Sequence, residues 1–441
     1  MPANADMNFD LPRGLTEYLG RLDAFIDAEI RPLEGADDNV RFFDHRREWA
    51  RTDFEHGGLP RPEWEALLRR VKNLADKAGH YRFALPKKYG GSDGSDLWMA
   101  VIREHFAAKG LGLHNDLQNE HSIVGNLPLV TMLDLYGSPQ QRAMIEGSIT
   151  GEYRVTFGLT EPDHGSDATH METRAVRTTE NGVPGWLING RKMWTTGMHV
   201  ATHCALFART SGKDGDAHGI TCFLVPADRD GVNVEEYLWT FNMPTDHPRV
   251  GFTDVFVAED ALFGEFGRGL SVAQCFVHQN RIRQAASSLG AAVYCINESV
   301  AYARRRKPFG RALAENQAIQ WPLVELATQA EMLRLLIRKT AWEMDQATQE
   351  EIEHNLSDKV SMCNYWANRL CCEAADRAMQ VHGGIGYSRH KPFEHIYRHH
   401  RRYRITEGSE EIQMRKVAGF LFGFMGPRRG KKEPRGEPAK A

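Results

Sequence analysis

The chain has 441 residues, of which 41% are hydrophobic and 26% are charged, and its formal net charge is −3. This composition supports sizeable hydrophobic cores, excludes disorder of the whole chain and argues against a dedicated nucleic-acid-binding protein. The length suggests about three units of domain size.

Membrane and export signals are not recognisable in the sequence. No apolar run approaches the roughly 18 residues of a membrane span, and the first ten residues, MPANADMNFD, lack both the basic start and the apolar core of a signal peptide. The seven cysteines form no CxxC pair and no regular framework, which favours reduced thiols. We therefore expect a cytoplasmic protein without integral membrane association.

The N-terminal third has helical periodicity. In LTEYLGRLDAFIDAEIRP (15–32) apolar residues recur at three- and four-residue steps, and Pro32 is expected to end the helix. We predict an α-helical domain with an extended lead over residues 1–152.

Short β-rich runs follow over residues 153–265. Gly, Asn and Asp clusters separate these runs, as expected for an all-β domain. The runs are YRVTFGL, GWLINGRKMWT, CALFART, GITCFLVPA and VGFTDVFV.

Helical periodicity returns over residues 266–425, most clearly in VELATQAEMLRLLIRKTAWEM. The last segment, GPRRGKKEPRGEPAKA (426–441), has six basic and two acidic residues and no large apolar group, so we predict a disordered basic tail.

Common nucleotide and metal signatures are missing. No P-loop is present, and HGGIGY (382–387) has the wrong spacing for a dinucleotide-binding turn, so a nucleotide cofactor would be held without a Rossmann crevice. His395, His399 and His400 could form a metal-binding helix face. Because no further ligand has a clear spacing, we interpret them as interface or surface histidines and predict no metal site.

The segment VTFGLTEPDHGSDATH (155–170) combines hydroxyl groups with a flexible backbone. Thr160, Ser166 and Thr169 supply hydroxyls, and Gly165 allows close approach of the backbone. Such a loop can bind phosphate or the polar edge of a flavin. An ordinary Gly/Ser-rich turn remains the alternative on this pattern alone.

Several segments, in order and spacing, resemble the signatures of the acyl-CoA dehydrogenase family. The branch that includes human members ten and eleven is the most similar in texture. The segments are LTEPDHGSD (159–167), GRKMWTTG (190–197), YARRRKPFGRALAENQAIQ (302–320), QVHGGIGYSRHKPFEHIYR (380–398) and RITEGSEEIQ (404–413).

The resemblance implies a mainly α fold with a middle β-domain. Its parts are an α-helical N-terminal domain, a β-barrel-like middle domain and a C-terminal four-helix bundle. FAD would lie between the β-domain and the bundle and reach into a neighbouring subunit, so a homodimer or homotetramer is expected.

The family's FAD contacts fall on matching positions of this chain. Trp194 and Thr196 would pack on and hydrogen-bond to the isoalloxazine, and Arg306 would bind the pyrophosphate of a neighbouring subunit's FAD. Glu411 stands where the family commonly has Gln. The full set is Phe157, Leu159, Thr160, Gly165, Ser166, Trp194, Thr196, Arg306, Phe309, Gln317, Gln380, Gly383, Gly384, Ser409 and Glu411.

Glu407 matches the family's catalytic base, whereas Asn280 occupies the position at which some members carry an alternative catalytic glutamate. Ser166, Arg281 and Gly408 match substrate-binding positions, although NRIRQ also offers Arg283 in place of Arg281. A carboxylate can remove the α-proton of a thioester when donors stabilise the developing enolate oxygen.

The implied reaction is FAD-dependent α,β-dehydrogenation of an acyl-CoA thioester to the 2-enoyl-CoA. Hydride would pass to flavin N5 and electrons to an electron-transfer flavoprotein, within fatty acid β-oxidation and lipid metabolism. The alternatives within the fold are an oxygen-using acyl-CoA oxidase, a monooxygenase relative, which the presence of Glu407 argues against, and a non-enzymatic DNA-binding flavoprotein. No nucleic acid partner is expected.

Overall fold

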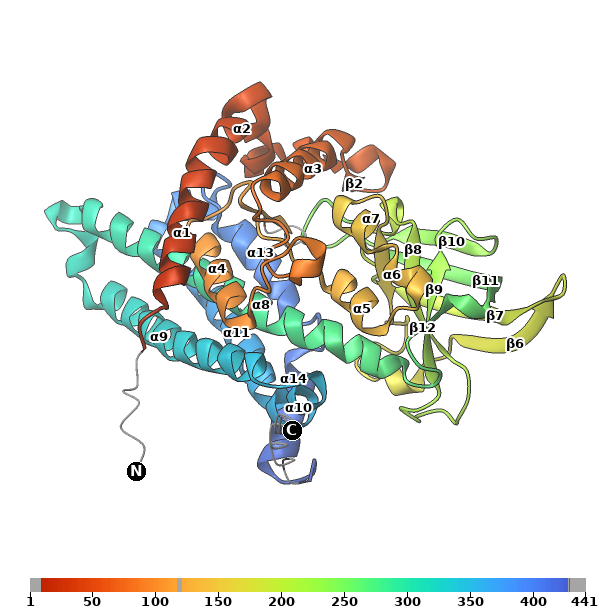
Figure 1. Ribbon diagram of the computed structural model, residues 1–441. Coiled ribbons are helices and arrows are strands. Elements are labelled where there is room, and N and C mark those ends of the chain that lie inside the picture. Colours follow the sequence, from red (N-terminus) through yellow and green to blue (C-terminus); the bar gives the residue numbers. More distant parts are fainter. Residues whose placement is uncertain (1–8, 117–120, 427, 429–441) are drawn as a thin grey trace, which may run out of the picture.

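A computed structural model describes residues 9–116, 121–426 and 428. Helices from both ends of the chain lie together on one side, and a curled β-sheet from the middle of the chain lies on the other (Figure 1). The predicted fold class, mainly α with a middle β-domain, is confirmed. The domain limits at residues 152, 265 and 425 stay predictions, and most of the predicted tail falls outside the described residues.

The N-terminal part is helical with one departure from the sequence prediction. The predicted stop at Pro32 is wrong, because a π-helical turn at Ile26–Ile30 follows α1 and Pro32 lies in the first turn of α2. A proline is tolerated there because its missing N–H has no partner in a first turn. The α-helices are α1 (Arg13–Phe25), α2 (Arg31–Gly35), α3 (Pro62–Lys77), α4 (Asp96–Ala107), α5 (Pro128–Tyr136), α6 (Pro139–Arg142) and α7 (Ile145–Thr150).

The main sheet has the strand order β10-β11-β7-β6-β8-β9-β12, and β5 pairs in parallel with β8. The five β-rich runs predicted from the sequence all contain strands. The strands are β5 (Val155–Gly158), β6 (Arg174–Glu180), β7 (Val183–Met193), β8 (His203–Arg209), β9 (Ile220–Pro226), β10 (Val232–Tyr237), β11 (Pro248–Ala258) and β12 (Leu262–Phe263); β1 (Thr52–Asp53) with β2 (Leu59–Pro60) and β3 (Asn115–Asp116) with β4 (His121–Ser122) form separate short pairs.

The C-terminal helices form a bundle around α11, which packs on α8, α9, α13 and α14. Small buried residues such as Ala285, Ala292 and Ala374 let α8 and α11 approach closely. The helices are α8 (Gly269–Arg305), α9 (Gln317–Asp345), α10 (Gln349–Glu351), α11 (Ser357–His382), α12 (Gly384–Tyr387), α13 (Phe393–Tyr403) and α14 (Glu410–Leu421).

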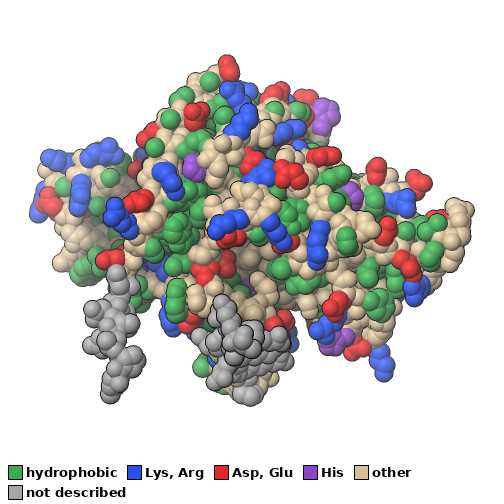
Figure 2. All heavy atoms as spheres, in the orientation of Figure 1, with side chains coloured by type: hydrophobic (Ala, Val, Ile, Leu, Met, Phe, Trp, Pro, Cys, Tyr) green, Lys and Arg blue, Asp and Glu red, His purple; other side chains and the backbone are tan. Residues whose placement is uncertain are grey.

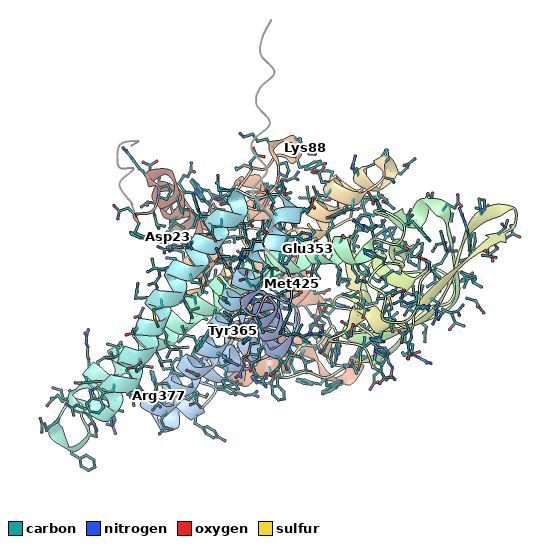
Figure 3. All side chains as sticks on the ribbon, turned by 90° about the horizontal axis from the view of Figure 1, so that it is seen from below. Asp23, Lys88, Glu353, Tyr365, Arg377 and Met425 are labelled. Atoms are coloured by element: carbon teal, nitrogen blue, oxygen red, sulfur yellow. The ribbon has the colours of Figure 1, made fainter. Side chains whose placement is uncertain are left out.

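Helix α8 spans the molecule. Its 37 residues correspond to about 55 Å of helix. Its N-terminal end adjoins the sheet, since Arg268 bridges Ile220, and its other end projects away from the sheet. Figures 1 and 3 show this projection from two directions, with Arg377 of α11 marking the same end of the bundle in Figure 3.

All seven cysteines are unpaired, in agreement with the reduced thiols expected from the sequence, and all are buried. The adjacent Cys371 and Cys372 lie on α11. Within residues 9–116, 121–426 and 428, no helix combines the length and the apolar character that crossing a membrane requires.

Candidate active site

The turn between α13 and α14 carries Glu407 in a left-handed backbone conformation, with a φ of 56°. Arg281 of α8 donates from Nε and Nη2 to the carbonyl oxygen of Glu407, at 2.9 and 2.5 Å. Gln413 of α14 donates from Nε2 to the carbonyl oxygen of Gly408, at 2.7 Å. Two buried side chains from different helices therefore hold the two peptide carbonyls at the predicted base.

Glycine is required at position 408 for two reasons. Its φ of 84° lies in the left-handed region, which other residues adopt at a cost. A Cβ at this position would also lie 2.8 Å from Nη2 of Arg281. Arg281 can therefore approach the turn this closely only because Gly408 has no side chain.

A buried amide network supports the turn from behind. Asn364 of α11 donates from Nδ2 to the carbonyl oxygen of Arg281 at 2.9 Å and accepts from Gln413 Nε2 at 3.1 Å. Asn368, one turn further along α11, also donates to Asn364 Oδ1 at 3.1 Å. Partnered buried amides fix one arrangement of the groups they join, because an unmade hydrogen bond there is costly.

The Arg281 guanidinium is buried, and burial lowers its pKa to about 10, while the nearby Glu407 opposes that shift. It therefore carries a positive charge at neutral pH. Asn280 is also buried, and its Oδ1 accepts from Asn126 Nδ2 at 3.1 Å. Arg283 also bonds to Asn126, so the two arginines of NRIRQ contact different parts of the chain. The predicted substrate contact of Arg281 stays a prediction.

Glu410 is buried, although it lies in a strongly charged segment of the sequence. Arg404 donates to both of its carboxylate oxygens at 2.9 Å, and Arg369 donates to Oε2 at 3.1 Å. The hydrogen bonds from Arg404, with those from Arg369, lower the pKa of Glu410 to about 2. The first turn of α14 is thereby tied to α11 and to the end of α13.

A buried ion pair supports the loop after β5. Lys192 Nζ lies 2.8 Å from Glu161 Oε1 and donates to the carbonyl oxygen of Leu159 at 3.2 Å. The backbone N–H groups of Glu172 and Thr173 donate to the same carboxylate at 2.6 and 2.8 Å. Burial alone would raise the pKa of Glu161, but Lys192 and these donors hold it below its ordinary value.

No role was predicted for Glu161 or Lys192, although both lie within the motifs that resemble the family signatures. Glu161 lies in the loop after β5 and Lys192 lies on β7, so their pairing is a tertiary contact that neither motif contains by itself. Gln413 and Asn364 were also missed, since amides on a helix carry no distinctive pattern.

Trp194 and Thr196 lie at the end of β7, next to the loop after β5. Met193 N donates to Thr160 O at 2.8 Å, and this bond joins the two segments. Trp194 has a left-handed φ of 61° and is 46% exposed, and Thr196 is exposed beside it. Thr196 Oγ1 also lies 2.8 Å from His247 Nδ1.

The loop after β5 is open on its outer side. A Cβ at Gly165 would contact only Thr160 Cγ2, at 3.8 Å, among the described residues, and Ser166 is exposed. An exposed aromatic ring, adjacent hydroxyl groups and an open glycine suit a planar ligand with a polar edge. This part of the structure fits a flavin ring. Phe157 and Leu159 line the same loop from within, where Phe157 stacks on Phe276 of α8.

A second set of predicted FAD-binding residues lies at the other end of the bundle. Arg306 follows α8 directly, 25 residues after Arg281, which corresponds to about 38 Å of helix. Phe309 there is fully exposed, and a Cβ at Gly383 or Gly384 would meet nothing within 4 Å. Gln317 begins α9 and Gln380 lies in the last turn of α11, both exposed. One chain therefore does not bring the two sets together.

The two remaining predicted cofactor residues follow the base directly. Ser409 is the N-cap of α14, where its Oγ accepts from Ile412 N at 3.4 Å, and Glu411 is exposed in the first turn of the helix. The structure thus places Glu407, Gly408, Ser409 and Glu411 on one turn.

The histidines of α13 are buried within the chain, so the interpretation of them as interface or surface residues is wrong. His400 Nδ1 bonds to Ser288 Oγ at 2.8 Å, His399 Nε2 bonds to the Tyr403 hydroxyl at 3.0 Å, and His395 stacks on His45. Burial lowers the pKa of all three, which keeps them neutral. Among the described residues no three His, Cys, Asp or Glu side chains are grouped as metal ligands would be.

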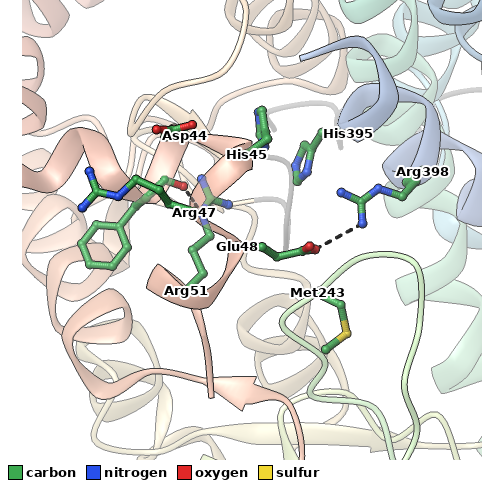
Figure 4. Close-up of a pocket in the computed structure, with 9 residues that line it drawn as sticks. Asp44, His45, Arg47, Glu48, Arg51, Met243, His395 and Arg398 are labelled. Carbon is green, nitrogen blue, oxygen red and sulfur yellow. Dashed lines mark hydrogen bonds and ion pairs between the residues drawn. The ribbon is translucent and has the colours of Figure 1, made fainter. Parts of the chain in front are cut away.

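The His45–His395 stack borders a small hollow between the N-terminal part and α13 (Figure 4). Its volume of about 20 Å³ has room for roughly one water molecule, which is too small for a cofactor. Arg398 Nη1 reaches Glu48 Oε1 at 3.3 Å across it. The residues around the hollow pack the N-terminal part against α13, and α13 leads into the Glu407 turn.

The protein thus combines a curled sheet with a helical bundle, a carboxylate turn in the bundle and an open aromatic and hydroxyl edge on the sheet. Comparison with known proteins gives the family. Residues 156–255 match the acyl-CoA dehydrogenase middle domain and residues 267–422 match the acyl-CoA dehydrogenase C-terminal domain. The chain belongs to the acyl-CoA dehydrogenase family.

Individual relatives agree with this assignment. The chain is 31% identical to the caffeyl-CoA reductase–Etf complex subunit CarC of Acetobacterium woodii, over 78% of this chain and 88% of that protein. It is 30% identical to an acyl-CoA dehydrogenase of Bacillus subtilis, over 79% of this chain and 88% of that protein. A solved structure of a putative acyl-CoA dehydrogenase from Mycobacterium abscessus has a TM-score of 0.79 at 27% identity, covering 94% of this chain and 100% of that one.

Proposed function

We propose that this protein is an FAD-dependent dehydrogenase that converts an acyl-CoA thioester to the 2-enoyl-CoA, with Glu407 as the base that removes the α-proton. The observation that carries the proposal is the pair of buried donors, Arg281 and Gln413, on the two carbonyls of the Glu407 turn. A base must be held within hydrogen-bond reach of the proton that it takes.

The residues divide the chemistry between them. Glu407 accepts the α-proton on its carboxylate, and its own backbone N–H donates to the thioester carbonyl oxygen, on which negative charge develops. Asn280 cannot take the base's place, because an amide does not accept a proton at neutral pH. Ser166 and Gly408 would contact the substrate. FAD, when bound, supplies the acceptor for the β-hydrogen.

Two parts of the chain would hold the cofactor. The exposed ring of Trp194, the Thr196 hydroxyl and the open loop at Gly165 and Ser166 fit the flavin end. Arg306, with its planar fork of donors, suits the pyrophosphate. Because Arg306 lies about 38 Å along α8 from Arg281, it would serve the FAD of a neighbouring copy.

The proposal therefore includes a homo-oligomer, a dimer or a tetramer. Helix α9 leaves a row of large apolar side chains exposed, and apolar side chains are visible on the bundle in Figure 2. Such a surface favours association with another copy. The residues are Trp321, Val324, Met332, Leu335 and Trp342.

We further propose an electron-transfer flavoprotein as the electron acceptor and a cytoplasmic role in fatty acid β-oxidation. The name of one relative, a caffeyl-CoA reductase–Etf complex subunit, supports the acceptor. Another relative, 31% identical over 80% of this chain, is a 3-(aryl)acrylate reductase. Run in reverse, the same site would reduce a 2-enoyl thioester, with Glu407 returning the proton.

The test is anaerobic reduction of the FAD-loaded protein by a panel of acyl-CoA thioesters, followed as loss of the flavin absorbance. Glu407→Gln should keep FAD and slow the bleaching by at least about 10²-fold, whereas Glu373→Gln, an exposed glutamate of α11, should bleach at the wild-type rate. Bleaching of Glu407→Gln at the wild-type rate would exclude Glu407 as the base. Rapid reoxidation by oxygen instead of electron-transfer flavoprotein would identify an oxidase.

A further inference from the structure

The Thr196 hydroxyl has a neighbour whose role is not explained by the proposed reaction. His247 Nδ1 lies 2.8 Å from Thr196 Oγ1. We propose that His247 is a positioning residue that turns the Thr196 hydroxyl proton outward, toward an acceptor atom on the edge of the flavin ring. This inference rests on the proposed function, because it takes Thr196 as part of the flavin site.

The backbone fixes the two residues beside each other. Residues 246–248 run along residues 195–197, with Gly197 N donating to Asp246 O at 2.9 Å and Thr195 N donating to Pro248 O at 3.3 Å. Leu238 N donates to His247 O at 3.1 Å on the other side. The backbones of His247 and Thr196 are therefore held side by side by strand-like pairing, which places the imidazole within reach of the hydroxyl.

The charged group next to the ring selects its tautomer. Burial lowers the pKa of His247, and Arg402 of α13 lowers it further while Asp246 opposes, so the ring is neutral and carries one N–H. Asp246 Oδ1 lies 3.4 Å from the same Nδ1. A carboxylate only accepts hydrogen bonds, so a lone pair on Nδ1 would face it repulsively. The proton therefore belongs on Nδ1.

With the proton on Nδ1, His247 donates to Thr196, and the Thr196 proton must point elsewhere. Among the described residues, the other acceptor within reach of this proton is Trp194 O, at 3.5 Å, which already accepts from Thr196 N at 2.9 Å. A contact of 3.5 Å is at the outer limit of a hydrogen bond. The proton is thus available to a closer acceptor on the exposed side of Thr196.

The direction of that proton affects the cofactor's affinity for electrons. A reduced ring carries more electron density on its polar edge than an oxidised one, so a donor there stabilises the reduced form more. If the His247 proton were on Nε2 instead, Thr196 would donate its proton to His247 Nδ1. Its hydroxyl would then present a lone pair to the flavin ring. The positioning by His247 should therefore raise the flavin midpoint potential.

The experiment measures the midpoint potential of FAD bound to the full-length protein by dye equilibration. His247→Leu should weaken the binding of reduced relative to oxidised FAD about tenfold, a shift of about 30 mV toward more negative potential. His247→Asn, which keeps an N–H donor near the position of Nδ1, should stay within threefold of wild type. His203→Leu is the matched control, because His203 Nδ1 makes the same type of bond, 3.0 Å to Thr202 Oγ1, on β8; it should not shift the potential.

Repeating the measurement in a Thr196→Val variant distinguishes a positioning role of His247 from a general structural effect of its replacement. In Thr196→Val the shift caused by His247→Leu should disappear, because no hydroxyl remains to be oriented. If His247→Leu does not accumulate as folded protein, His247→Phe keeps the ring volume without the N–H and carries the same expectation. A wild-type potential in the folded variant, or an undiminished shift in the Thr196→Val background, overturns the inference while leaving the proposed function intact. Failure of the wild-type chain to bind FAD overturns both.

Discussion

The guanidinium of Arg281 contacts the carbonyl oxygen of Glu407 through two N–H donors, at 2.9 and 2.5 Å. A buried charge from the middle of α8 thus acts on the backbone of the predicted base, which lies 126 positions further along the chain. The pair joins two helices of the bundle at the site, so the orientation of Glu407 depends on the packing of α8 against the α13–α14 turn.

Replacing Arg281 should distinguish positioning from substrate binding. Arg281→Lys cannot make both contacts to Glu407 O, so we expect kcat to fall by about 10- to 10²-fold through misplacement of the base, with KM changed by less than threefold. Steady-state kinetics with the best acyl-CoA of the panel provides the measurement. A rise in KM at unchanged kcat would instead favour the substrate contact predicted from the sequence. Arg283→Lys, which alters a contact with Asn126, is the comparison.

Gly408→Ala should lower the free energy of unfolding by more than the cost of its left-handed backbone conformation alone. The left-handed φ costs about 1–2 kcal/mol for any L-residue. Gly423→Ala shares this cost, with a φ of 76° and no atom within 4 Å of the added Cβ. At Gly408 the Cβ also meets Arg281 Nη2, so urea unfolding should show a larger loss there, together with slower flavin reduction. Equal losses for the two variants would mean that Arg281 moves aside freely.

Removing only one partner of the Glu161–Lys192 pair should strongly lower the free energy of unfolding. Lys192→Met leaves a buried carboxylate without its cation and should lower the free energy of unfolding by about 3–5 kcal/mol. The double variant Glu161→Gln, Lys192→Met removes both charges and should recover a large part of this loss. Urea unfolding of the three proteins gives the comparison. A loss below about 1 kcal/mol in Lys192→Met would indicate that water reaches Glu161.

Glu410 should make stability depend on pH in the acid range. Its pKa of about 2 in the folded chain is below the ordinary value of 4.5, because Arg404 and Arg369 bind its carboxylate. A group with a lowered folded pKa stabilises the fold above its unfolded pKa, and the contribution disappears as pH falls from about 4.5 toward 2. This contribution is on the order of 3 kcal/mol.

The measurement is urea unfolding of wild type and Glu410→Gln between about pH 6 and pH 3. The difference in unfolding free energy should be largest at about pH 6 and should shrink steadily below pH 4.5. Glu373→Gln, at an exposed position of α11, should show no such trend. A difference that is constant with pH would mean that the Glu410 carboxylate is not the stabilising group.

The fold class and the family could be predicted from the sequence because hydrophobic periodicity and motif order are local properties. The β-runs and the long helix α9 are examples, and both were found in the structure. The π-helical turn before Pro32 could not be predicted, since Ile26 and Ile30 of this turn are buried in the N-terminal core, and such tertiary contacts are not visible in a local pattern. The burial of His395, His399 and His400 was also missed, because a run of histidines and arginines looks solvated when its partners are unknown.

By itself the sequence determined the types of residue available: one glutamate before a glycine at position 407, an amide at position 280, and a hydroxyl-rich loop after a strand. Only the tertiary structure decided how these groups are held, since Arg281, Gln413 and Asn364 reach the Glu407 turn from three helices. It also decided that Arg306 lies too far along α8 to join the same site. Such relations depend on helix length and packing between distant segments, which no short motif contains.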